Sequence, residues 1–299
     1  MDPLLILFGL GVGVLVGTTG MGGGSLMTPL LILVFGIKPV VAIGTDLAYA
    51  AVTKTVGGFR HFRQGTVDIP LALWLGVGSV PGALGGTLLL DRLQAVYGDA
   101  IDQGVIAAVA VGLLLSGGAV LWRALFLPGV IERERETVDP ITRRDKAAAM
   151  LLGLAIGFVL GATSAGSGAL IAVGLILIFR LTPLRVVGTD VFHAAIVLWV
   201  AAAAHLVSGN VDLSLAANIM IGSVPGVWIG ARLAAKLPPA GLRPALGVVL
   251  LASALGLLTK VGVAIPGAVL VAAPLALGVV AYLVQRARAP RLRPATDGA

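Results

Sequence analysis

The sequence predicts an all-α polytopic membrane protein that consists of two inverted-topology repeats. Of its 299 residues, 58% are hydrophobic and only 12% are charged, whereas a soluble domain has roughly 25% charged residues. Residues 9–93 align without a gap on residues 153–237, and a glycine-rich break interrupts both copies at the same place. Each repeat is therefore expected to contain a re-entrant helical hairpin and three long helices, and an extra C-terminal helix follows the second repeat.

The internal repeat is specific, because polar blocks recur together with the apolar background. Gly44-Thr45-Asp46 is repeated as Gly188-Thr189-Asp190, and the segment 78–82 is repeated unchanged as 222–226. Chance similarity between apolar stretches would not reproduce such blocks in the same order. Two residues that this alignment pairs are called copy partners.

The apolar segments give the predicted domain organisation. In the first repeat they lie at 4–17, 25–35, 39–62, 69–90 and 101–126. At 1.5 Å per residue, the first two are too short to cross a ~30 Å hydrocarbon core. The prediction is a membrane repeat at 1–126, a cytoplasmic linker at 127–146, a second membrane repeat at 147–260, a transmembrane helix at 261–285 and a cytoplasmic tail at 286–299.

Three arrangements of each short pair are open: two full crossings, a hairpin that dips to mid-depth and returns, or one long interrupted helix. If the pair returns to its starting side, one membrane face keeps only Lys38, Arg92 and Lys260, and the other collects the remaining basic residues outside the helix interiors. A single crossing would divide these residues almost evenly. The positive-inside rule thus favours inverted repeats with the N-terminus outside and the C-terminus in the cytoplasm, and the short lengths favour the re-entrant hairpin.

The two glycine-rich breaks are the predicted substrate site. Non-helical backbone at membrane depth requires cover by protein or a polar cavity, and helix N-termini with free N–H groups bind anions. A small anion is therefore the expected substrate, although small residues also let helices pack closely. The candidate residues are Thr18, Thr19, Met21, Gly22, Gly23, Gly24 and Ser25 in the first copy, and Thr163, Ser164, Gly166, Ser167 and Gly168 in the second.

Four ionisable residues inside apolar segments are the coupling candidates. Asp46 and Asp190 are expected either to carry a coupling proton or cation, or to cap the hairpin tips and helix ends. Lys54, whose copy partner is Leu198, is expected to pair with one of these carboxylates or to attract the substrate. His193 shares a helical face with Asp190, so it is a candidate proton relay or a packed, hydrogen-bonded histidine.

A glycine-rich break, a Gly-Thr-Asp block and a histidine near a Gly-x-Val-Asp turn, all in two copies, resemble the TauE/SafE sulfite exporter family over nearly the whole chain. The resemblance implies a transporter of sulfite, sulfoacetate or related organosulfonates in the bacterial inner membrane. Serine is common in that family after Gly-Thr, whereas this chain has Asp46 and Asp190. The substrate, the direction of transport and the coupling ion therefore stay open.

Other classes of function are disfavoured. The net charge of +7 follows from positive-inside anchoring, so no nucleic-acid partner is expected. The sequence has no cysteine and no metal-ligand spacing, and no metal or cofactor is expected. An anion channel is the main alternative, whereas an intramembrane hydrolase that uses Ser167 and His193 is disfavoured because Gly23 is the copy partner of Ser167. The expected partners are the lipid bilayer and the anion, with a homodimer left open.

Overall fold

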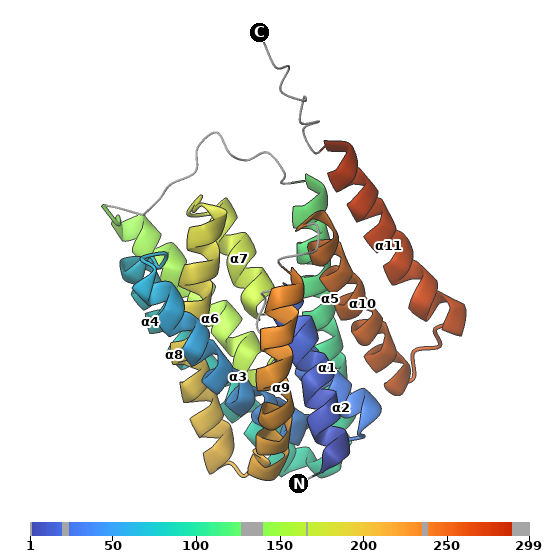
Figure 1. Ribbon diagram of the computed structural model, residues 1–299. Coiled ribbons are helices and arrows are strands. Elements are labelled where there is room, and N and C mark those ends of the chain that lie inside the picture. The colour runs from blue at the N-terminus through green and yellow to red at the C-terminus, as the bar shows by residue number, and fades with distance from the viewer. Residues whose placement is uncertain (1, 20–23, 127–139, 166, 235–238, 289–299) are drawn as a thin grey trace.

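The computed structural model describes residues 2–19, 24–126, 140–165, 167–234 and 239–288, and these parts are almost entirely helical (Figure 1). In chain order the helices are α1 (Pro3–Thr19), α2 (Gly24–Val34), α3 (Pro39–Arg63), α4 (Ile69–Tyr97), the short 3₁₀ helix η1 (Gly98–Ile101), α5 (Asp102–Phe126), α6 (Arg143–Thr163), α7 (Ser167–Leu177), α8 (Pro183–Val207), α9 (Leu213–Ala234), α10 (Pro239–Lys260) and α11 (Gly267–Arg288).

Several helical stretches in the described ranges are long and apolar enough to cross a membrane. They are Ile69–Trp122, Arg143–Thr163, Leu184–Val207, Leu213–Gly230 and Gly267–Val284. In contrast, α2 and α7 have 11 residues each, which is about half of what a crossing needs. The chain is therefore a multi-pass membrane protein with one pair of unusually short helices.

In the first repeat the helix boundaries agree with the apolar segments except at the end of α4, and beyond this repeat α6 begins at Arg143, within the predicted linker, and α11 continues to Arg288. The apolar run of α4 stops before Asp91, but the helix continues to Tyr97. Asp91, Arg92 and Gln94 are polar without breaking a helix. The helix ends instead at Gly98, where φ is +56° and a residue without Cβ is favoured.

The most extensive helix packing is between the two copies. α1 packs along α9 of the other copy, and α6 packs along α4, while α3 packs on α8 and α5 on α10 (Figure 1). Glycines on these helices also contact the backbone of the other copy. A Cβ at Gly13 would lie 2.4 Å from the Ser223 carbonyl oxygen, and a Cβ at Gly157, its copy partner, 2.3 Å from that of Ser79. Such a seam between backbones is the role of small residues in membrane helices.

The central helices α3 and α8 run antiparallel. Gly44, near the start of α3, contacts the backbone of Asn210 just beyond α8, whereas Gly58, near the end of α3, contacts Phe192 near the start of α8. Between them, Trp199 Nε1 donates to Thr55 Oγ1 at 2.9 Å. These two helices, which are copies of each other, therefore point in opposite directions.

The two helices on either side of each glycine-rich break form an antiparallel hairpin. The Phe8 ring near the start of α1 lies 4.8 Å from the Phe35 ring just after α2. In the second copy, Gly174 near the end of α7 contacts the Leu152 side chain in the first half of α6. In both pairs the second helix therefore runs back along the first.

The repeated Gly-Thr-Asp block connects the copies. Thr45 Oγ1 accepts from the Asp212 N–H at 3.0 Å, and Thr189 Oγ1 accepts from the Asp68 N–H at 3.0 Å. Asp212 then caps α9 by accepting from the Leu215 N–H. The threonine of each block therefore fixes the turn before a helix of the other copy, which explains why Gly-Thr and Gly-x-Val-Asp recur together.

Candidate substrate and coupling site

Asp46 is the point at which the two hairpins meet. It lies in α3 and is fully buried, and its Oδ2 accepts from Thr28 Oγ1 at 2.6 Å and from Ser164 Oγ at 2.9 Å. Thr28 belongs to α2 of the first hairpin, and Ser164 follows α6 of the second. One carboxylate thus connects both hairpins to a central helix.

The chain path at Ser164 explains how its hydroxyl reaches Asp46. Ser164 caps the C-terminus of α6 in the left-handed conformation with φ +55°, and its N–H donates to the Leu160 carbonyl. This conformation is unfavourable for a residue with a Cβ. Thr163 uses its hydroxyl locally, since it donates to the Val159 carbonyl at 2.7 Å and accepts from the Ala165 N–H.

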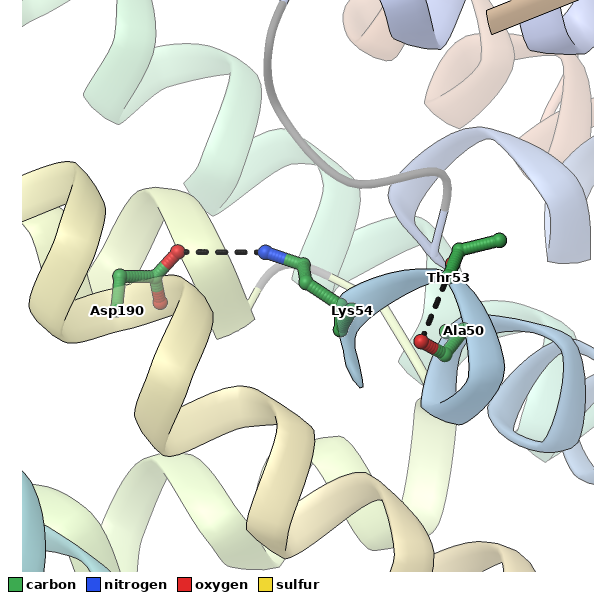
Figure 2. A network of polar contacts seen from close by, with 4 residues as sticks. All are labelled: Ala50, Thr53, Lys54 and Asp190. Carbon is green, nitrogen blue, oxygen red and sulfur yellow. Dashed lines mark hydrogen bonds and ion pairs between the residues drawn. The ribbon is translucent and has the colours of Figure 1, made fainter. Parts of the chain in front are cut away.

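Asp190 lies at the equivalent position of α8 but has a different partner. Its Oδ2 is 3.4 Å from Lys54 Nζ, and both side chains are mostly buried, with 11% and 12% exposure. Figure 2 shows the lysine extending from α3 toward the carboxylate on α8. A Cβ at Gly168 would lie 3.5 Å from Asp190 Oδ2, so the first turn of α7 approaches the same oxygen.

The sequence accounts for this difference between the two carboxylates. The copy partners of Thr28 and Ser164 are Ala172 and Gly20, which have no hydroxyl, and the copy partner of Lys54 is Leu198. Within the described ranges, Asp46 therefore has hydroxyl donors and no paired lysine, whereas Asp190 has a lysine. Both carboxylates keep one buried oxygen, Oδ1, without a hydrogen-bond partner in the described part of the chain.

His193 is buried beside Asp190 and is held by Ser79 on α4. Its Nε2 lies 2.8 Å from Ser79 Oγ, and that hydroxyl donates to the Leu75 carbonyl. The hydroxyl proton is thus in use, so Nε2–H is the donor to Ser79. His193 Nδ1 is left as a buried acceptor without a partner among the described residues.

Only part of the predicted anion site can be placed. Thr18 Oγ1 donates to the Leu15 carbonyl at 2.9 Å. Thr19 ends α1, Gly24 and Ser25 begin α2, and Ser167 begins α7, but the side chains of Thr19, Ser25 and Ser167 lie outside what the structure describes. Met21, Gly22, Gly23 and Gly166 lie outside them entirely. Anion binding at the tips therefore stays a prediction.

Two residues of this site were missed from the sequence. Thr28 is a single hydroxyl in an apolar arm and Ser79 lies in a glycine-rich helix, where both are typical of helix packing. One signal was present for Thr28: its copy partner is Ala172, so the hydroxyl is specific to one copy.

Removing the hydroxyl donors to Asp46 is expected to destabilise the protein more than additively. Thr28→Val and Ser164→Ala should each lower the free energy of unfolding by about 1.5–3 kcal/mol, as for hydrogen bonds to charged groups. Their combination should exceed the sum, because Oδ2 then loses both donors. Thermal melting of the four proteins in detergent measures this. Ser116→Ala, which removes only a local bond to the Gly112 carbonyl, is the control, and strict additivity would contradict the shared role of Asp46.

Among the residues that the structure describes, no group of three or more histidine, cysteine, aspartate or glutamate side chains is close enough to hold a metal ion. Two separate polar sites lie along the contact between α3 and α8. Asp46 forms one, and Asp190, Lys54 and His193 form the other.

Comparison with known proteins agrees with this architecture. A family model described as sulfite exporter TauE/SafE matches residues 5–257. The chain is 38% identical over 259 residues to the probable membrane transporter protein YjnA of Bacillus subtilis (strain 168), covering 86% of this chain and 100% of that protein. It is 28% identical to YdhB of the same organism, over 81% of this chain and 94% of that protein.

A probable membrane transporter protein of Xylella fastidiosa (strain Temecula1) is 27% identical, over 79% of this chain and 87% of that protein. No solved structure matches the chain. The family match covers both hairpins, both Gly-Thr-Asp blocks and α3 and α8, on which the polar sites lie. This chain therefore belongs to the TauE/SafE sulfite exporter family of membrane transporters.

Proposed function

We propose that the protein is a secondary transporter that moves a small sulfur-containing anion, such as sulfite, sulfoacetate or a related organosulfonate, across the bacterial inner membrane. The observation that carries the proposal is the meeting of both hairpins at Asp46, which accepts from Thr28 of the first hairpin and Ser164 of the second, while the start of α7 lies beside Asp190. Discontinuous helices that meet between two repeats form the binding sites of many secondary transporters. The family supplies the sulfur chemistry.

The proposed topology is a pair of inverted repeats, each with a re-entrant hairpin. Antiparallel packing of α3 on α8 supports inversion, because these helices are copies of each other. α5 and α10 add support, since Gly117 contacts Leu251 and Gly247 contacts Leu121. The short length of α2 and α7 supports hairpins that do not cross fully.

We propose that the N-terminus faces outside and the C-terminus faces the cytoplasm. The start of α1 lies at the opposite end of the helix bundle from the end of α11 (Figure 1). Arg60 and Arg63 end α3 and Arg143 begins α6, at the end of the bundle assigned to the cytoplasm. The positive-inside rule supports this orientation.

We also propose that transport is coupled to a proton or cation through the intramembrane carboxylates. An unpaired carboxylate repels an anionic substrate, so either a proton or a cation is required when both share the cavity. Asp46 and Asp190 each have a buried oxygen, Oδ1, that has no hydrogen-bond partner among the described residues and is available to a proton or a cation. His193, adjacent to Asp190 on α8, is the proposed relay.

Transport by purified protein in liposomes tests this function. Liposomes preloaded with unlabelled sulfite should accumulate external labelled sulfite by counterflow, and sulfoacetate should compete. Counterflow requires a carrier that alternates between two states, so passive equilibration without counterflow would indicate the alternative, a channel. Protein-free liposomes give the background, and acetate and chloride test selectivity. A protein that moves none of the sulfur anions under any gradient would contradict the proposal.

A further inference from the structure

Lys54 and Asp190 form an ion pair that is buried but incompletely satisfied. The 3.4 Å separation is longer than the 2.8 Å of the exposed Lys38–Asp99 pair, and charge-assisted bonds are usually about 2.7–2.9 Å long. Asp190 Oδ1 has no partner among the described residues. A buried pair stabilises a protein only if its remaining hydrogen-bonding capacity is also satisfied, so a purely structural role explains this arrangement poorly.

The contrast with Asp46 points in the same direction. Asp46 is held by two hydroxyls at 2.6 and 2.9 Å, which is how a carboxylate with a structural role is secured. Asp190 has neither hydroxyl, because the copy partners of Thr28 and Ser164 are Ala172 and Gly20. Among the described residues, Asp46 is thus tightly bound, whereas the equivalent carboxylate, Asp190, has one long contact, with Lys54.

Asp190 also lies where an anion would bind. Its Oδ2 lies 3.4 Å from the Lys54 ammonium nitrogen, and a Cβ at Gly168, in the first turn of α7, would lie 3.5 Å from the same oxygen. An ammonium group and a helix N-terminus are both features that attract anions, and here both lie near one oxygen of a protein side chain. A sulfite or sulfonate oxygen in that position would meet the same two groups.

We infer that the Asp190 carboxylate is a tethered anion. In the empty transporter it occupies the position of the substrate's anionic group beside Lys54, and the substrate binds Lys54 by displacing this carboxylate. The inference rests on the proposed anion transport and names the residue that binds the substrate's charge. The two anions exclude each other, since both need the ammonium and repel one another in a medium of low dielectric constant. Asp46 keeps the hairpins connected throughout.

Binding of sulfite and methanesulfonate to purified variants tests the inference. Asp190→Asn should bind both anions at least about tenfold more tightly than wild type, because the competitor is gone. Lys54→Met should bind them at least about tenfold more weakly, as expected when one charge-assisted hydrogen bond is lost. Asp46→Asn is the matched control and should not bind more tightly. Titration calorimetry measures the affinities, and size-exclusion chromatography checks folding.

The double variant Lys54→Met/Asp190→Asn separates this role from a structural one. If the pair only stabilises the fold, the double variant leaves no unpaired charge and should recover wild-type affinity. If Lys54 holds the substrate, the double variant should remain as weak as Lys54→Met. Recovery of affinity, or unchanged affinity in Asp190→Asn while wild type binds sulfite, would overturn the inference and leave the proposed function intact. If neither wild type nor Asp190→Asn binds any sulfur anion, both fail.

Wild-type protein provides a test that does not depend on the folding of variants. A hydrophobic carbodiimide labels carboxyl groups, and peptide mass spectrometry distinguishes Asp190 from Asp46. Saturating methanesulfonate should increase labelling at Asp190 by several-fold, because the carboxyl group is released from Lys54, and should leave Asp46 unchanged. Protection of Asp190, or an equal change at both residues, would contradict displacement.

Discussion

Gly13→Ala and Gly157→Ala are each expected to cost about 3 kcal/mol or more of folding free energy, at or above the upper end of typical overpacking. The new methyl carbons would lie 2.4 Å from the Ser223 carbonyl oxygen and 2.3 Å from that of Ser79. Backbone atoms cannot move aside as a side chain would, so α1 must separate from α9, or α6 from α4. Thermal melting by fluorescence-detected size-exclusion chromatography should show a large loss for each variant and little folded protein for the double variant.

The control for this prediction comes from the chain itself. Gly11 lies two positions before Gly13 on α1 and a Cβ there has no atom within 4 Å. Its copy partner is already alanine, Ala155. Gly11→Ala should therefore melt at or above the wild-type temperature, since alanine favours a helix more than glycine does. Equal losses in Gly11→Ala and Gly13→Ala would show that the contact with α9 does not determine stability.

Asp46→Ala is expected to abolish transport and to produce the largest stability loss of any polar substitution in the α3 and α8 region. It removes the acceptor of two hydrogen bonds, worth roughly 1.5–3 kcal/mol each to a charged group, and leaves the Thr28 and Ser164 hydroxyls buried without that partner. The hairpin connection through α3 is lost with it. Melting temperature and sulfite counterflow in liposomes measure both effects.

Asp46→Asn distinguishes two roles of Asp46: connecting the hairpins by hydrogen bonds, and carrying a coupling proton. The amide oxygen can still accept from both hydroxyls, so the fold should be largely kept. If Asp46 carries the coupling proton, counterflow should persist while accumulation driven by a pH gradient disappears. If Asp190 carries it instead, this loss should occur in Asp190→Asn and not in Asp46→Asn. An intact response to pH gradients in both variants would exclude a coupling proton on either residue.

Much of the helix order could be predicted because apolar runs, glycine breaks and prolines act locally. Pro39 and Pro183 begin α3 and α8 as expected, and each break is followed by a short helix of 11 residues. The packing of α1 on α9 and of α6 on α4, each between the two copies, could not be predicted. It depends on which small-residue faces meet, and Gly9, Gly13, Gly153 and Gly157 fit several partners equally well until the three-dimensional arrangement is known.

The site was predictable to the level of residue type and no further. Carboxylates and a lysine in apolar helices indicate polar contacts, and the pairing of Lys54 with Asp190 was one of three alternatives that the sequence left open, beside pairing with Asp46 and attraction of the substrate. The Thr28 and Ser164 contacts with Asp46 join residues from three segments of the chain. The left-handed conformation of Ser164 directs its hydroxyl, and nothing in the local sequence requires that conformation at a serine.

The packing of α1 on α9 also constrains the order of biosynthesis. α1 ends at Thr19 and its partner begins at Leu213, so most of the chain must leave the ribosome before the glycine face of α1 is covered. A shorter length of chain separates α4 from α6, which begins at Arg143, so this pair can form earlier during synthesis. Nascent chains truncated before α9 should therefore keep α1 accessible to lipid or to the insertion machinery, and the N-terminal helix should be among the last to reach its native contacts.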